Sequence, residues 1–306
     1  MLDLMPRYRL DMHVHTRVSP DGLDLPEKVV DAAVRAGLDG IVITDHDRGD
    51  AYDRLVELGL ADPSGEPVNG FLVVPGVEVS CNEGHVLVIG AAWSAPAGLL
   101  AREVALRAHE QGALCVAPHP FDRFRSGVGR TTLDEVSFDA IEVCNSKTLD
   151  MRSNTLAAEY AEKTALPGLA GSDAHEAATV GRAHTLVDAE RLSVRAVVNA
   201  VAAGEVEVVH GLHTRGEIAR YLARGWVTRP WLVDWASRMC GRAARAIFTG
   251  GSSPALDQWR RRPAQDEASS VGPALDRRTR AGSAIAPLGA ERSAPARSSA
   301  RYAARD

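Results

Sequence analysis

The chain has 306 residues, 45% of them hydrophobic and 25% charged, and a formal net charge of −5 at pH 7. Such a chain is long enough to bury the core of one large domain or of two small ones. No apolar run approaches the roughly 20 residues that a membrane span needs, and the first residues, MLDLMPRYRLD, carry acids where a secretory signal has an apolar stretch. We therefore expect a cytoplasmic protein without a membrane partner, and four scattered cysteines without a C-x-x-C pair argue against a disulfide framework.

Short apolar strands alternate with amphipathic helices between residues 7 and 210. In chain order, strands are predicted at 8–14, 40–46, 71–79, 84–92, 113–119, 140–146, 166–174, 183–189 and 206–211. Helices with one apolar face are predicted at 26–37, 98–112, 148–165 and 193–205. Repeated βα units of this kind indicate an α/β fold with a largely parallel sheet covered by helices, which is either open or closed into a barrel.

The chain changes in character after the last predicted strand. Residues 215–248 are predicted to form one or two helices that pack on the sheet domain, whereas residues 250–306, rich in Ala, Arg, Ser, Gly and Pro, are predicted to be disordered. Ten arginines against six acids give this tail a charge of +4 and leave −9 on residues 1–249. The tail could contact nucleic acid or another acidic surface, but a solvated, dispensable extension is the simpler interpretation.

Stopping the chain near Gly250 is expected to leave folding and activity intact, because the tail lacks the periodic apolar residues that a core requires. Only weak, salt-sensitive binding to polyanions should be lost. Thermal unfolding of the full-length and shortened chains tests this expectation. A shortened protein that melts several degrees lower would show that the tail packs on the fold.

Residue types that bind metal ions gather at the ends of the predicted strands. His13 and His15, two apart on one strand, point to the same face roughly 6.5 Å apart along the chain, so both can reach one ion. An isolated pair of this kind is more often solvent-facing, but six of the ten histidines lie at strand boundaries beside Asp or Glu. In a parallel barrel the carboxyl ends of the strands share one rim. The residues that would meet there are His13, His15, Asp45, His46, Glu78, His85, His119, Asp173 and His175.

Six short motifs carry a family resemblance: HVHTRVSPDG, ITDHD, PGVEVS, GHVLVIG, APHP and GSDAHEAATVGRAHT. In this order and spacing they resemble the PHP (polymerase and histidinol phosphatase) superfamily of metal-dependent phosphoesterases, over residues 8 to 210. The resemblance implies a distorted (β/α)7 TIM-like barrel, the PHP fold, which we assign to residues 1–212. The C-terminal helical extension predicted from the sequence pattern then covers 213–249, and the tail predicted from its composition to be disordered covers 250–306. It also implies a site for two to three divalent transition metals at the carboxyl rim.

The metal ligands that the resemblance implies fall into three sets. The first set is His13, His15, Glu78 and Asp173; the second is His85 and His119, with Glu78 as a bridge; the third is His46, His175 and Asp21. Asp21 lies in the SPDG turn, whose distance from the first histidines varies in the family, so a solvated turn aspartate is its alternative. Asp45 points away from His46 on the same strand, and we expect it to orient a ligand.

The chemistry of this set suits phosphate esters. Imidazoles and carboxylates without thiolates favour zinc, manganese or iron(II), and a metal-bound water with a pKa lowered toward 7 would supply the nucleophile. Phosphate also needs cationic donors, and Arg123, Arg125 and Arg182 follow proposed ligands on the same rim. Asn145 either faces the site or caps the next helix.

The four histidines outside the motif ligands are expected to have other roles. His109 is predicted to face solvent, and His210 and His213 are predicted to be structural. His184 is either structural or a neighbour of the metal ligands.

Two classes of function remain. The first is hydrolysis of a phosphate ester, either a small-metabolite or nucleotide monoester or a short-oligonucleotide diester; the alternative is a non-catalytic, metal-stabilised scaffold. An amide hydrolase on a related barrel is less favoured, because Lys28, Lys147 and Lys163 lie in or beside predicted helices rather than at strand ends. The charge of −9 on residues 1–249 argues against stable binding of duplex nucleic acid. The substrate and the oligomeric state are not predicted.

Overall fold

A computed structural model describes residues 5–96, 98–122, 124–148 and 151–228 of the chain. The predicted tail at 250–306 and most of the predicted helical extension fall outside these residues, and so does Arg123. Within the described ranges, every helix is too short or too polar to cross a membrane.

One nine-stranded sheet forms the centre of the fold, and each predicted strand is confirmed within a few residues. The strands are β1 (Arg7–Val14), β2 (Gly40–Ile43), β3 (Leu72–Ser80), β4 (His85–Ile89), β5 (Leu114–Ala117), β6 (Ala140–Asn145), β7 (Gly168–Gly171), β8 (His184–Asp188) and β9 (Val206–Val209). Their order in the sheet is β7-β6-β5-β4-β3-β2-β1-β8-β9.

The pairing is more mixed than repeated βα units imply. β1–β2, β2–β3, β5–β6 and β6–β7 are parallel, whereas β3–β4, β4–β5, β1–β8 and β8–β9 are antiparallel. The short connection at 81–84 explains the reversal at β4, because a parallel pair needs a crossover of a dozen or more residues. The first residue of β4, His85, consequently pairs with Ser80 at the end of β3 and lies at the same rim.

The sheet is nearly closed into a barrel, because the end of β1 meets the end of β7. The Asp173 amide donates to the His13 carbonyl at 2.8 Å, and the His15 amide donates to the Ala174 carbonyl at 2.9 Å. Gly171 permits this approach, since a Cβ at that position would lie 2.5 Å from the Cβ of His13. The barrel-like α/β fold predicted from the motifs is therefore confirmed.

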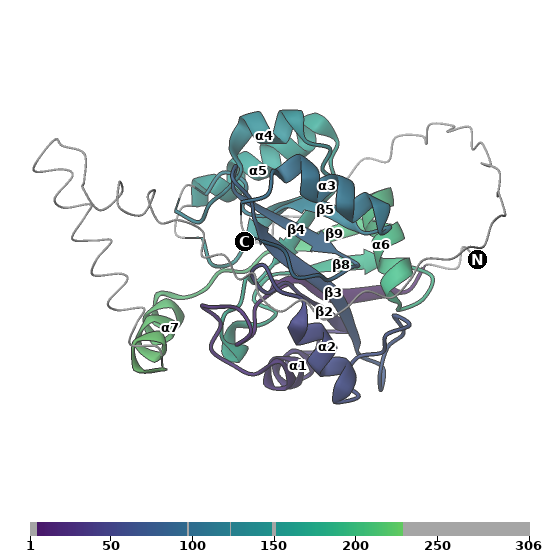
Figure 1. Cartoon of the computed structure of the whole chain (residues 1–306), viewed down its shortest axis with the longest axis vertical. Helices are drawn as coiled ribbons and strands as arrows, with labels where there is room; N and C mark the ends of the chain where they lie inside the picture. Colours follow the sequence, from purple (N-terminus) through teal and green to yellow (C-terminus); the bar gives the residue numbers. More distant parts are fainter. Residues whose placement is uncertain (1–4, 97, 123, 149–150, 229–306) are drawn as a thin grey trace, which may run out of the picture. The chain divides into compact units, whose positions relative to one another are not determined.

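Helices cover the outside of the barrel, with α1 and α2 at one side of it and α3, α4 and α5 at the opposite side (Figure 1). Their bounds are α1 (Pro26–Arg35), α2 (Asp50–Glu57), α3 (Ala101–Glu110), α4 (Gly129–Glu135), α5 (Met151–Thr164), α6 (Val194–Ala203) and α7 (Arg215–Thr228), with a 3-10 turn at Ala177–Thr179. The four predicted helices between 26 and 205 are confirmed, whereas α2 and α4 were not predicted. The four predicted helices, α1, α3, α5 and α6, each bury one face. In α6, for example, Val197 and Val201 join the core cluster of Leu10 and Leu72.

Local signals in the sequence set the ends of α6. The hydroxyl of Ser193 accepts a hydrogen bond from the Ala196 amide at 3.3 Å and so caps the first turn, a contact that contributes about 1 kcal/mol. Gly204 ends the helix with φ of 75°, the left-handed conformation that favours glycine. These two residues therefore set where α6 begins and where it ends.

Candidate metal centre

Histidines and carboxylates from distant parts of the chain meet at the rim formed by the ends of β1, β2, β3, β5 and β7 and the start of β4. They form four overlapping groups, and in each group the possible ligand atoms lie within 4.8 Å of one another. The members of these groups are His13, His15, Asp21, His46, Glu78, His85, His119, Asp173 and His175. All nine residues that the motifs assign to metals are thus brought together, and we call them the nine-residue cluster.

Glu78 lies at the centre of the nine-residue cluster. Its side chain is 1% exposed, and five imidazole nitrogens surround its two carboxylate oxygens. Oε2 lies 3.2 Å from His13 Nε2, 3.1 Å from His15 Nε2 and 3.4 Å from His46 Nδ1; Oε1 lies 2.9 Å from His85 Nδ1 and 3.1 Å from His119 Nε2. Burial raises the pKa of this carboxyl, but the neighbouring histidine charges hold it well below its usual range.

His13 and His15 face each other across the centre of the cluster. Their Nε2 atoms are 3.0 Å apart, and His13 Nδ1 lies 3.1 Å from the buried carboxylate of Glu142. A carboxylate on the far nitrogen of a ligand histidine fixes the orientation and basicity of the ring. The motifs did not single out Glu142, although it lies on the predicted strand at 140–146.

Backbone strain marks two of the cluster residues. His119 adopts φ of 29° and Asp173 adopts φ of 51°, backbone conformations that residues other than glycine rarely adopt. Such strain persists only where the surrounding structure enforces it, and it is concentrated at functional sites. It turns both side chains to the rim just after β5 and β7.

Asp21 lies in the nine-residue cluster and is therefore not a fully solvated turn residue. Its Oδ2 is 2.8 Å from His175 Nε2 and 3.7 Å from His46 Nε2, and its Oδ1 accepts a hydrogen bond from the Ser19 hydroxyl at 2.9 Å. Burial raises the pKa of Asp21, but the charge of His175 lowers it well below the usual range.

Asp45 organises the loop that carries Asp21. Its oxygens accept hydrogen bonds from the Thr16 amide at 2.6 Å, the Thr16 hydroxyl at 2.7 Å and the Ser19 amide at 3.1 Å. Ser19 in turn lies 3.4 Å from His15 Nδ1. The fully buried carboxylate of Asp45 therefore acts on the cluster through this loop, in line with an orienting role.

The donor atoms of the cluster fit divalent metal ions. His46 Nδ1, His119 Nδ1 and Asp173 Oδ1 are buried, and none of them has a hydrogen-bond partner among the described residues. Buried polar atoms without partners are costly, and a metal ion would satisfy such atoms. Six imidazoles and three carboxylates without a thiolate are the donors that zinc, manganese and iron(II) accept.

The predicted phosphate-binding arginines have different positions. Arg125 reaches the cluster: its Nη1 donates to Asn145 Oδ1 at 2.6 Å, and its Nη2 pairs with Asp173. The structure does not bring Arg182 to the cluster, because its guanidinium pairs with the buried carboxylate of Glu217 on α7. Arg123 lies outside the described residues.

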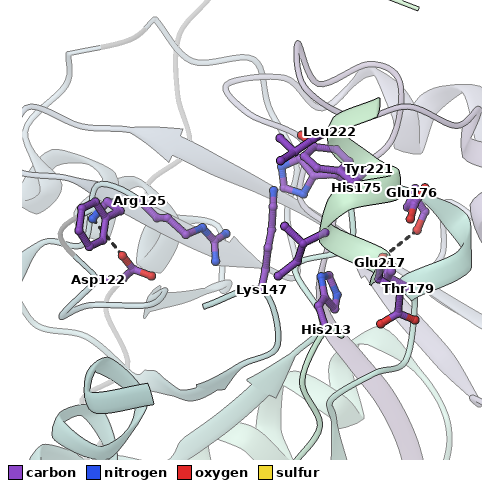
Figure 2. A pocket seen from close by; sticks show the side chains of 12 residues that line it. Asp122, Arg125, Lys147, His175, Glu176, Thr179, His213, Glu217, Tyr221 and Leu222 are labelled. Atoms are coloured by element: carbon purple, nitrogen blue, oxygen red, sulfur yellow. Dashed lines mark hydrogen bonds between the residues drawn. The ribbon is translucent and has the colours of Figure 1, made fainter. Parts of the chain in front are cut away.

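A pocket of about 320 Å³ opens beside the cluster (Figure 2). Asp122 and Arg125 lie on one side of it, and His175 lies on the other side beside Tyr221 and Leu222 of α7. The other lining residues are Phe124, Lys147, Glu176, Thr179, His213, Glu217 and Ile218. Lys147, His213 and Tyr221 were not predicted to take part in the site. For Lys147 a signal existed, since it directly follows the strand predicted at 140–146.

Ion pairs and a hydrogen bond from Tyr221 hold α7 against the barrel. Arg220 and Arg224 both pair with the buried carboxylate of Glu176, at 2.8 and 2.9 Å, and Arg224 also pairs with Asp24 at 2.9 Å. The Tyr221 hydroxyl donates to the Asp21 carbonyl at 3.1 Å. A chain segment about 200 residues from Asp21 therefore completes the pocket.

The remaining histidines lie outside the cluster. His109 is 2.8 Å from Asp139 on the surface, and His184 Nδ1 is 3.4 Å from the Gly181 carbonyl. His210 is exposed, whereas His213 lines the pocket and its Nε2 has no hydrogen-bond partner among the described residues.

Comparisons with known proteins agree with this geometry. A family model described as PHP domain matches residues 11–165, and one described as PHP-associated matches residues 151–206. An uncharacterized protein of Methanocaldococcus jannaschii is 32% identical over 182 residues, which are 58% of this chain and 69% of that protein. A second uncharacterized protein of this organism is 28% identical over 159 residues, which are 49% of this chain and 88% of that protein.

Solved structures share the fold. A two-domain protein of Bacteroides vulgatus, described as containing a predicted PHP-like metal-dependent phosphoesterase, has a TM-score of 0.57 at 21% identity over 73% of this chain and 71% of its own. PsfC of Pseudomonas syringae has a TM-score of 0.53 at 25% identity over 74% of this chain and 100% of its own. A lesion-specific endonuclease of Pyrococcus furiosus has a TM-score of 0.51 at 18% identity over 66% of this chain and 58% of its own.

Proposed function

The chain belongs to the PHP domain family, and we propose on this basis that it hydrolyses a phosphate ester with divalent metal ions bound in the nine-residue cluster. The family and the fold support metal-dependent phosphoester hydrolysis in general. The observation that carries the proposal is Glu78, a buried carboxylate whose two oxygens face five imidazole nitrogens. An arrangement of this kind is suited to a carboxylate that bridges two metal ions.

The residues would divide the metals among them as the motifs indicate. His13, His15 and Asp173 would hold one ion and His85 and His119 a second, with Glu78 between them; Asp21, His46 and His175 would hold a third. Bound zinc, manganese or iron(II) lowers the pKa of a bound water toward 7 and offsets negative charge on phosphoryl oxygens.

Other side chains would orient the ligands and bind the substrate. Glu142 holds the ring of His13 in place, and Asp45 holds the loop of Asp21. Arg125 would donate to phosphoryl oxygens in the fork geometry that suits arginine, and its contact with Asn145 at the edge of the cluster supports this role.

The proposed substrate is a small-metabolite or nucleotide monoester, or the diester of a short oligonucleotide. A pocket of about 320 Å³ is at the small end of ligand sites, which favours a compact substrate. One structure with the same fold is described as a lesion-specific endonuclease, which keeps diesters among the candidates. The charge of −9 on residues 1–249 disfavours extended duplex binding.

A phosphate-ester panel tests the proposal. Metal-loaded protein is assayed with a generic aryl phosphate, nucleotide monophosphates and short oligonucleotides, with chelator-treated protein as the control. Chelator-sensitive hydrolysis of one class would support the proposal and identify that class. Protein that binds at least two metal equivalents but cleaves no ester would instead favour the non-catalytic scaffold.

A further inference from the structure

Lys147 crosses the pocket beside the nine-residue cluster. It follows β6, and its side chain extends toward Tyr221 and His175, with Arg125 to one side (Figure 2). The ammonium nitrogen lies 4.8 Å from the centre of the Tyr221 ring, a cation–π distance. Within the described part of the chain, no carboxylate oxygen lies within ion-pair distance of this ammonium group.

The carboxylates that line the pocket are engaged by other groups. Glu217 pairs with Arg182, Glu176 pairs with Arg220 and Arg224, and Asp122 accepts hydrogen bonds from the Phe124 amide and the Thr148 hydroxyl. An ammonium group withdrawn from water is costly unless an anion or hydrogen-bond acceptors compensate it. The aromatic face of Tyr221 compensates only part of that cost, because such contacts contribute about 0.5–2 kcal/mol.

We propose that Lys147 contacts the phosphate group of the substrate, from a position between Arg125 and Tyr221. This inference rests on the proposed function and adds a substrate-contacting residue that the motifs do not contain. Arg125 supplies a planar fork from the loop after β5, whereas Lys147 supplies a compact point charge from the loop after β6. Tyr221 of α7 keeps the ammonium group over the pocket, so the docking of α7 contributes to anion binding.

Inorganic phosphate is the probe for this contact, because it binds without turnover. Isothermal titration of the metal-loaded full-length protein compares the wild type with Lys147→Met, Lys147→Arg and Lys163→Met. Loss of a charge-assisted hydrogen bond should raise the Kd for phosphate about 10- to 100-fold in Lys147→Met, and Lys147→Arg should recover part of the affinity. Lys163, exposed on α5, is the matched control, and its replacement should change nothing. Metal content is measured in every variant.

Three results would overturn the inference: no measurable phosphate binding by the wild type, equal phosphate Kd values in wild type and Lys147→Met, or equal losses in Lys147→Met and Lys163→Met. A lower Tm with an unchanged Kd would assign Lys147 a structural role against Tyr221 only. If Lys147→Met does not unfold cooperatively, Lys147→Gln replaces it. Wild-type protein that binds phosphate through Lys147 but hydrolyses no ester would contradict the proposed function alone. Equal kcat/KM values for an ester in the wild type and in Lys147→Met would contradict this inference alone.

Discussion

Replacement of Glu78 by glutamine should lower the turnover of a phosphate ester by at least about 10²-fold, the scale of losing a key transition-state stabiliser. The carboxylate is buried and faces five imidazole nitrogens, so its charge would be shared by two metal ions. An amide removes that charge and offers only one oxygen as a ligand. Metal content should therefore fall together with kcat, while the circular dichroism spectrum stays that of the wild type because the barrel core does not include this side chain.

Glu83→Gln is the matched control for this variant. Glu83 is an exposed residue five positions further along, and its Oε2 accepts a hydrogen bond from the Ala101 amide at 3.1 Å. An amide oxygen can still accept that bond, so turnover and metal content should stay near the wild-type values. If Glu78→Gln and Glu83→Gln were both near wild type in rate and metal content, Glu78 could not be a bridging ligand, and the other ligands assigned from the same motifs would be in doubt.

The strands could be predicted because each is a short apolar run between turn residues. The two helices that were not predicted are short and bury few residues: Ala51 and Leu55 in α2, and Thr132 and Leu133 in α4. The other differences are the directions of β4 and β8, each of which is antiparallel to both of its neighbours. The cause is visible in the sequence for β4, since only four residues, 81–84, separate it from β3, too few for a parallel crossover.

The cluster could be predicted because its residues follow strand ends in recognisable motifs, and strand ends meet wherever the sheet closes. The far wall of the pocket could not, because it depends on how α7 docks, and this docking uses pairs such as Arg224 with Asp24 that are 200 residues apart. The same docking redirects Arg182, which pairs with Glu217 of α7. Lys147 was set aside for its position beside a helix, whereas the loop that follows β6 turns it into the pocket.

Removal of bound metal is expected to abolish hydrolysis and to destabilise the fold. The cluster brings six imidazoles and three carboxylates into a buried site, and ions that bind only the folded state stabilise it by about 2.7 kcal/mol at a free concentration of 100 times Kd. Reconstituted protein should therefore carry two to three equivalents of zinc, manganese or iron and melt several degrees above the chelator-treated protein. Elemental analysis and thermal unfolding measure both quantities. Less than one equivalent of metal after reconstitution would rule out the metal-dependent mechanism.

The affinity of the cluster for metal ions should increase with pH, because His13 has to lose a proton before it can bind a metal ion. Burial lowers the pKa of His13, but the carboxylates of Glu78 and Glu142 outweigh burial and raise the pKa to about 9. At pH 7 the metal-free histidine therefore keeps a proton that a metal ion must displace, so apparent affinity should increase about tenfold per pH unit for each proton released. Titrations at several pH values between 6.5 and 8, in two buffers of different ionisation enthalpy, count those protons. Affinity that is constant over this range would mean that His13 is already neutral before metal binds, and its place among the ligands would then need direct spectroscopic evidence.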